Sequence, residues 1–159
     1  IELLRRVHIP SPDKRIDAIR RLTAAGVPVT VMFAPAIPGL NDHEMEAVLA
    51  RAAEAGATGA GYVALRLPLE IKDLFREWLE SDHPDRARRV MSLVRQMRGG
   101  KDYDAQWGSR MRGKGPIADL LSARFKVARR RYGLDAQWVP PGVSHFRIPP
   151  RAGDQIDLF

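Results

Sequence analysis

Basic side chains alternate with aromatic ones in the middle of the second half of the chain. Six cationic residues flank Tyr103 and Trp107: Arg95, Arg98, Lys101, Arg110, Arg112 and Lys114. Cations suit phosphate contacts, and aromatic rings can stack on nucleobases. We therefore predict that this segment binds nucleic acid. The alternative is that the two rings pack the segment onto the body of the protein and that solvent surrounds the arginines.

The positive charge is concentrated in one part of the chain. The 159 residues carry a net charge of +7, but residues 86–131 alone have 14 basic and 3 acidic side chains, a net charge of +11. The flanking segments 1–85 and 132–159 are slightly acidic. This asymmetry favours a polyanionic partner such as DNA or RNA. A solubilising arginine-rich surface is the other interpretation.

A short turn at residues 34–42 follows an apolar, β-branched run and precedes a helical pattern. In parallel α/β folds ligands bind where strands end, so this turn is a candidate site. Gly39 permits a close backbone approach, Ile37 offers an apolar contact, and Asp42 lies beside free helix N–H groups. A rigid strand-to-helix turn without a ligand explains the same residues.

Arg66 falls near the end of the next predicted strand. A guanidinium there can bind a carboxylate or phosphate group of a cofactor or substrate. The alternative is a surface ion pair between Arg66 and Glu70. We assign no catalytic residue, and the four histidines are not spaced as metal ligands, so no metal site is predicted within the chain.

The order of predicted elements is helix, strand, helix, strand. Ser11 is expected to cap the first helix, with Pro12 at its first position. The run 27–35 is apolar on both faces and predicts a buried strand, and a second strand is predicted at 59–67. Asn41 and Glu44 form a potential capping box for the helix between them. These lengths predict an α/β fold with a parallel sheet.

Three more helices are predicted after residue 70 from apolar residues at helical spacing. Their apolar faces begin at Ile71, Ala87 and Ile117. We divide the chain into residues 1–85, a basic helical extension at 86–133, and an irregular tail at 134–159. No segment has the length and apolarity of a membrane span, and a cytoplasmic location is expected. Because Ile1 comes within a helical pattern, we expect the chain to be the C-terminal piece of a longer protein.

Several stretches resemble one known family. They read "AGVPVTVMFAPAIPGLNDHE", "AGATGAGYVALRLPLE", "VRQMRGGKDYD" and "RMRGKGPIADLL". Together they are similar to the C-terminal part of radical S-adenosylmethionine (SAM) enzymes, in the group of spore photolyase-like DNA repair proteins. The similarity covers most of residues 10–133.

The resemblance implies a partial (β/α)6, TIM-like barrel of which this chain forms the C-terminal part. Family members bind a [4Fe–4S] cluster through three cysteines and use it with SAM in radical chemistry. The chain contains no cysteine, so the cluster ligands are expected outside it, and the fragment alone is expected to be inactive. The family's SAM-binding element falls on Ile37, Gly39 and Asp42, where Asp42 replaces the usual Glu.

The last five residues resemble a second kind of motif. Gln155, Leu158 and Phe159 match the short peptide by which bacterial polymerases and repair proteins bind the DNA sliding clamp. A proline- and glycine-rich spacer at 149–153 precedes it. The alternative is a frayed tail that ends in apolar residues.

The leading hypothesis is a fragment of a radical SAM enzyme that acts on nucleic acid. A non-catalytic nucleic-acid-binding adaptor tethered to the clamp is the alternative from another functional class. A different TIM-barrel enzyme with an anion site at the Gly39 turn is a third.

Overall fold

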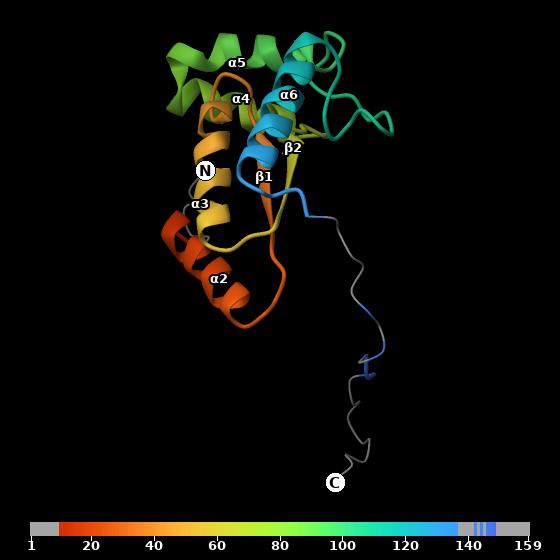
Figure 1. The fold of residues 1–159 in the computed structure, drawn as a ribbon. Helices are drawn as coiled ribbons and strands as arrows, with labels where there is room; N and C mark the ends of the chain where they lie inside the picture. Colours follow the sequence, from red (N-terminus) through yellow and green to blue (C-terminus); the bar gives the residue numbers. More distant parts are fainter. Residues whose placement is uncertain (1–9, 137–141, 143, 145, 149–159) are drawn as a thin grey trace, which may run out of the picture.

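Two parallel strands joined through a helix form the centre of the structure (Figure 1). The computed structural model describes residues 10–136, 142, 144 and 146–148. The elements are α2 (Pro12–Ala24), β1 (Thr30–Ala36), the 3-10 turn η1 (Asp42–Glu44), α3 (Met45–Glu54), β2 (Gly59–Ala64), α4 (Ile71–Asp82), α5 (Pro84–Gln96) and α6 (Pro116–Arg131).

The first helix begins as its sequence predicts. The Ser11 side chain accepts a hydrogen bond from the Lys14 backbone N–H at 3.4 Å, and Pro12 is the first residue of α2. Ile16 is its one buried residue. The helix ends before Gly26, whose positive φ of 77° turns the chain toward β1.

The parallel sheet is confirmed, but both strands are shorter than predicted. Thr30 pairs with Gly59, and Phe33 pairs with Tyr62. β1 starts three residues later than the apolar run, and β2 ends at Ala64. The described residues form two strands and not a closed barrel, so the barrel remains a prediction for a longer protein.

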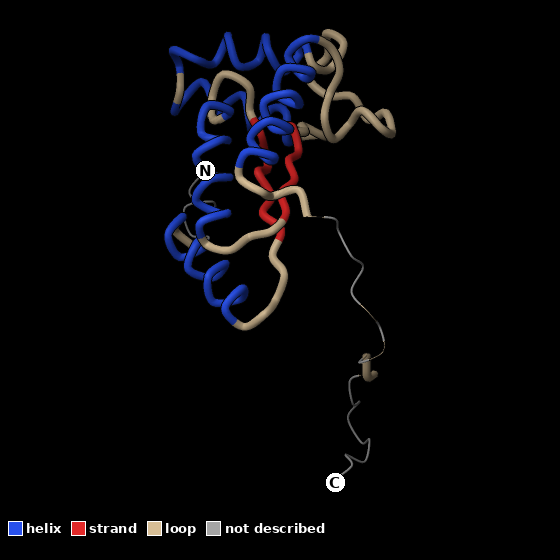
Figure 2. The backbone as a smooth tube through the Cα atoms, viewed as in Figure 1, coloured by secondary structure: helices blue, strands red, loops and turns tan. Residues whose placement is uncertain are grey.

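Helices cover only one face of this sheet (Figure 2). Phe33 and Tyr62 point into a core formed with α3 and α6. Thr30, Met32 and Ala34, which alternate with Phe33, are exposed, and Met32 keeps 54% of its surface. The prediction that β1 is buried on both faces is therefore wrong for the described residues, because no described helix packs on the second face.

The outer edge of β2 is covered by two carbonyl groups. The Ala60 N–H donates to the Leu134 carbonyl at 3.1 Å, and the Ala64 N–H donates to the Met111 carbonyl at 2.8 Å. Gly59 and Asp135 also form an antiparallel bridge. Leu134 is fully buried in the core and holds residues 134–136 against β2, and this short segment has no regular structure beyond that bridge. The division of the chain at residue 134 remains a prediction.

A second core joins the predicted 1–85 segment to the basic helices. Leu65, Leu67 and Leu79 pack with Val90 and Val94 of α5. Helices α4 and α5 lie against each other at the end of the molecule opposite α2 (Figure 1).

Candidate functional site

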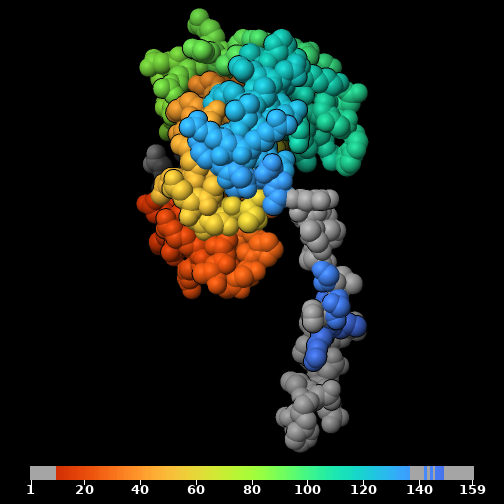
Figure 3. Space-filling model, viewed as in Figure 1, coloured from red at the N-terminus to blue at the C-terminus, as the bar shows by residue number. Residues whose placement is uncertain are grey.

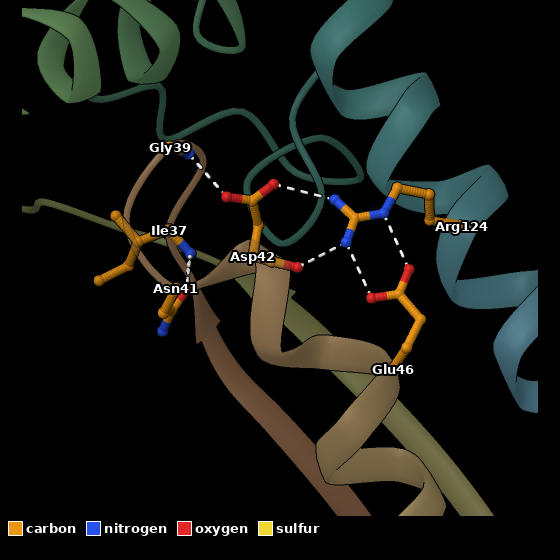
Figure 4. Close-up of polar contacts among 6 residues, drawn as sticks. All are labelled: Ile37, Gly39, Asn41, Asp42, Glu46 and Arg124. Carbon is orange, nitrogen blue, oxygen red and sulfur yellow. Dashed lines mark hydrogen bonds and ion pairs between the residues drawn. The ribbon is translucent and has the colours of Figure 1, made fainter.

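In the turn between β1 and η1, side chains of the turn form hydrogen bonds with its own backbone groups (Figure 4). The Ile37 N–H donates to Asn41 Oδ1 and the Gly39 N–H donates to Asp42 Oδ1, each at 2.7 Å. Asn41 Nδ2 donates back to the Pro35 carbonyl at 3.0 Å. The predicted capping box of Asn41 and Glu44 is therefore wrong. The Asn41 side chain serves the turn before it, and α3 begins only after η1.

Arg124 of α6 fastens this turn to α3. Its Nε and Nη2 donate to the two carboxylate oxygens of Glu46 at 2.9 and 2.8 Å, and its Nη1 donates to Asp42 Oδ2 at 2.9 Å. The hydrogen bond from Arg124 lowers the pKa of Glu46 below its usual value, and the same bond raises the pKa of Arg124. Sequence reasoning missed Arg124, because its partners lie 78 and 82 residues away.

The three residues matched to SAM binding already have partners in the protein. Ile37 is 7% exposed and lies in the second core. A Cβ on Gly39 would lie 2.9 Å from Leu93 Cδ1, so this glycine allows α5 to approach. Asp42 is bound by Gly39 and Arg124. These groups do not fit a direct contact with adenosine in the described structure, and SAM binding through them remains a prediction.

Arg66 lies at the carboxyl end of β2 without a carboxylate partner among the described residues. Its Nη2 donates to the Tyr103 hydroxyl at 3.2 Å, and its buried Nε has no hydrogen-bond partner. No ion pair joins it to Glu70, so that alternative is wrong among the residues described. Arg66 therefore holds Tyr103 at the strand end.

The loop 99–115 is fastened to the same strand end by Arg98. This guanidinium is buried and donates to the carbonyls of Leu65 at 2.7 Å and Ser109 at 3.1 Å. Burial lowers the pKa of Arg98. The basic loop thus lies at the carboxyl edge of the sheet, and Figure 3 shows it as the teal flank beside α6.

The two aromatic residues of the loop have different environments. Trp107 is 81% exposed, and the Arg110 guanidinium lies 4.1 Å from the centre of its ring. The alternative that both rings pack the loop onto the body is therefore wrong for Trp107, although it holds for Tyr103. Tyr103 is half-buried and bound by Arg66. The Arg110 guanidinium lies over the exposed indole ring, so a cation and an aromatic ring are stacked on the surface of this loop.

Two further predicted cations of the loop, Arg112 and Lys114, have local partners. The Arg112 guanidinium lies 5.5 Å from the centre of the Tyr62 ring, and Lys114 Nζ donates to Gln106 Oε1 at 2.6 Å. Both side chains are exposed, and both lie on the same loop as Trp107. Of the residues predicted to bind nucleic acid, Trp107, Arg110, Arg112 and Lys114 thus lie on one loop. Arg98 is buried beneath that loop, and Arg95 is paired with Asp102.

Three further predictions concern a metal site, a membrane span and clamp binding. Among residues 10–136 and the few described beyond them, no group of three or more His, Asp or Glu is placed to hold a metal ion. No helix of that part is long and apolar enough to cross a membrane. The clamp-binding residues Gln155, Leu158 and Phe159 lie outside the described residues.

Comparison with known proteins gives relatives but no family. An uncharacterized protein of Mycobacterium bovis and one of Mycobacterium tuberculosis are each 35% identical to the chain over 145 residues. The match covers 90% of this chain and 39% of each relative, so the chain spans well under half of their length. No protein-family model matches the chain. No solved structure matches it either.

Proposed function

We propose that the chain is the nucleic-acid-binding, C-terminal part of a longer cytoplasmic radical SAM enzyme. The observation that carries the nucleic-acid part is the exposed Trp107 with Arg110 over its ring, on a basic loop at the carboxyl end of the sheet. Proteins that bind single strands combine aromatic rings, on which bases stack, with cations that contact the phosphates. The enzyme part rests on the sequence resemblance.

The bare face of the sheet supports a longer protein. Thr30 and Met32 lie over Gly59 and Gly61 of β2, since a Cβ on either glycine would meet them within 2.8 Å. This face is exposed in the described residues, and β1 pairs there only with β2. Further strands joined to β1 would place the face inside a barrel, as the resemblance implies.

The cofactors of such an enzyme would be bound mainly by the rest of the protein. A [4Fe–4S] cluster needs thiolate ligands, and this chain has no cysteine. When bound, the cluster and SAM supply a radical that removes hydrogen from a substrate. Because the polar groups of the Ile37 turn are already used, we derive no chemical step from these residues.

The nucleic-acid part is tested by fluorescence anisotropy with a labelled single-stranded oligonucleotide. Trp107→Ala should weaken binding about 5- to 150-fold, the range for losing one stacked base. Arg110→Ala with Lys114→Ala should also weaken it. The matched control is Arg20→Ala with Arg21→Ala, which removes equal charge from exposed positions on distant α2. If both pairs of substitutions weaken binding equally, net charge alone explains the effect, and a specific binding site on the loop is contradicted.

The enzyme part is tested on the longer protein that contains this chain. After anaerobic reconstitution with iron and sulfide, it should cleave SAM to methionine and 5′-deoxyadenosine. Binding of nucleic acid without a cluster or SAM cleavage would support the adaptor alternative.

Clamp recruitment has its own test. Leu158→Ala with Phe159→Ala should abolish capture on immobilised sliding clamp, and unchanged capture would contradict the clamp prediction.

A further inference from the structure

A hollow of about 390 Å³ lies beside the carboxyl end of β2, between the start of α4 and the basic loop. It is distinct from the Ile37 turn and does not include Trp107 or Arg110. Its lining residues are Leu67, Leu69, Lys72, Lys101, Asp102 and Tyr103.

The electrostatic environment of the hollow is positive. Lys72 and Lys101 are exposed, and neither forms an ion pair within the described part of the chain. The carboxylate of Asp102 is already shared by Arg76 and by Arg95, whose Nε lies 2.7 Å from Oδ1. The single acid in the lining is therefore neutralised, while the two ammonium groups are not.

The hydroxyl of Tyr103 adds a directed donor. Its oxygen accepts a hydrogen bond from Arg66 Nη2, so the phenolic hydrogen remains available for an acceptor. Arg66 itself has no carboxylate partner among the described residues and contributes further positive charge. An anion in the hollow can thus receive hydrogen bonds from two ammonium groups and one hydroxyl.

One rim residue is held in an unusual conformation. Leu69 has a φ of 49°, a left-handed conformation that is costly for a residue other than glycine. Its side chain is 80% exposed, while the neighbouring Leu67 is buried. Such strain is concentrated at ligand sites, and here it presents an apolar side chain beside the cationic groups.

We propose that this hollow binds one phosphorylated nucleoside. The phosphate contacts Lys72, Lys101 and Tyr103, and the sugar or base lies against Leu69. The volume lies within the range of small-molecule sites. The choice of ligand rests on the proposed nucleic-acid function, and it adds one defined phosphate position to that function. The phosphate can belong to a free nucleotide or to a strand.

The test is a titration of the chain with adenosine monophosphate (AMP), followed by isothermal titration calorimetry. Lys72→Ala with Lys101→Ala should weaken binding by about tenfold or more, since two charge-assisted hydrogen bonds are lost. Tyr103→Phe should weaken it severalfold. The control is Lys14→Ala with Lys126→Ala, which removes equal charge from exposed positions of α2 and α6. Unchanged thermal unfolding shows that each variant is folded.

Several results would overturn the inference. They are no dependence of either AMP or oligonucleotide binding on Lys72 and Lys101, equal weakening in the two lysine pairs, and adenosine binding as tightly as AMP. If the proposed function is wrong, the pattern differs. Oligonucleotide binding then does not depend on Trp107, while AMP binding still depends on Lys72 and Lys101. If only oligonucleotides depend on those lysines, the phosphate comes from a strand and the free-nucleotide arm of the inference is wrong.

Discussion

Arg124 joins three separate parts of the chain through one guanidinium group. It contacts the turn after β1, the first residues of α3, and its own helix α6. Its side chain is 29% exposed, so solvent screens the network only in part. The contact is more ordered than a single surface ion pair, because Glu46 is bound by two nitrogens.

Arg124→Ala should lower the free energy of unfolding by about 1–2 kcal/mol, an intermediate value between surface and buried pairs. Urea denaturation measures the change. Arg51→Ala is the control, since Arg51 pairs with the highly exposed Asp13 and should cost less than about 0.5 kcal/mol. Equal costs would show that the Arg124 network contributes no more than an ordinary surface pair.

Glu46 gives the same network a pH dependence. Its pKa is lowered from the usual 4.5 by the Arg124 hydrogen bond, so the folded state favours the carboxylate. The stabilisation is fully present above pH 4.5 and is lost as the pH falls through the lower folded-state pKa. Glu46→Gln should therefore destabilise the protein at pH 7 and much less in acid. A constant difference in urea denaturation across this range would contradict the prediction.

Gly39 was identified from sequence as a position of close approach, but the structure changes the group that approaches it. We predicted that it allows a close approach, and it does, but the approaching group is Leu93 of α5. Gly39→Ala should cost about 2 kcal/mol in thermal or urea unfolding, because its φ is 77° and the new methyl group would collide. Gly99→Ala has a similar φ and open space, so it should cost about half as much.

At the scale of elements, the sequence predicts helices better than strand environments. Apolar residues at helical spacing identify α3, α4, α5 and α6, because local spacing determines which side chains share a face. The exposed face of β1 could not be predicted, because Thr, Met and Ala suit a covered or an uncovered face equally. Which face is covered depends on helices far away in the chain.

Leu134 anchors the short segment that closes the outer edge of β2. Its side chain is 0% exposed and lies in the main core. Leu134→Ala should therefore cost about 2–4 kcal/mol in urea denaturation. Leu120→Ala, at a position that is 56% exposed, should change stability by less than about 0.5 kcal/mol. A small effect at Leu134 would show that residues 134–136 add little to the folded state.

At the scale of the whole molecule, charge and topology place the basic loop at the edge where parallel sheets bind ligands. The positive segment and its aromatic residues were predictable from sequence, since composition alone shows them. The anchoring of the loop was not, because Arg98 and Arg66 act through Leu65 and Tyr103, which no local pattern connects. Lys72 of the hollow was missed for the same reason, whereas Lys101 was predicted as part of the basic segment.

Salt dependence tests the loop as a polyanion site. If Arg110 and Lys114 each neutralise one phosphate of a single strand, their replacement should reduce the slope of log K against log salt by about 1.4. Replacing Arg20 and Arg21 should leave the slope unchanged. Anisotropy titrations at several salt concentrations give both slopes, and an unaltered slope in the loop variant would contradict direct phosphate contact.

The carbonyl groups of Met111 and Leu134 over β2 also bear on self-association. With that side closed, a further copy can add only along β1, whose partner within the described residues is β2 alone. Two molecules joined through β1 would leave no open strand for a third, because each would end in its closed β2 side. Misassembly through this sheet should therefore stop at pairs and should not grow into fibrils.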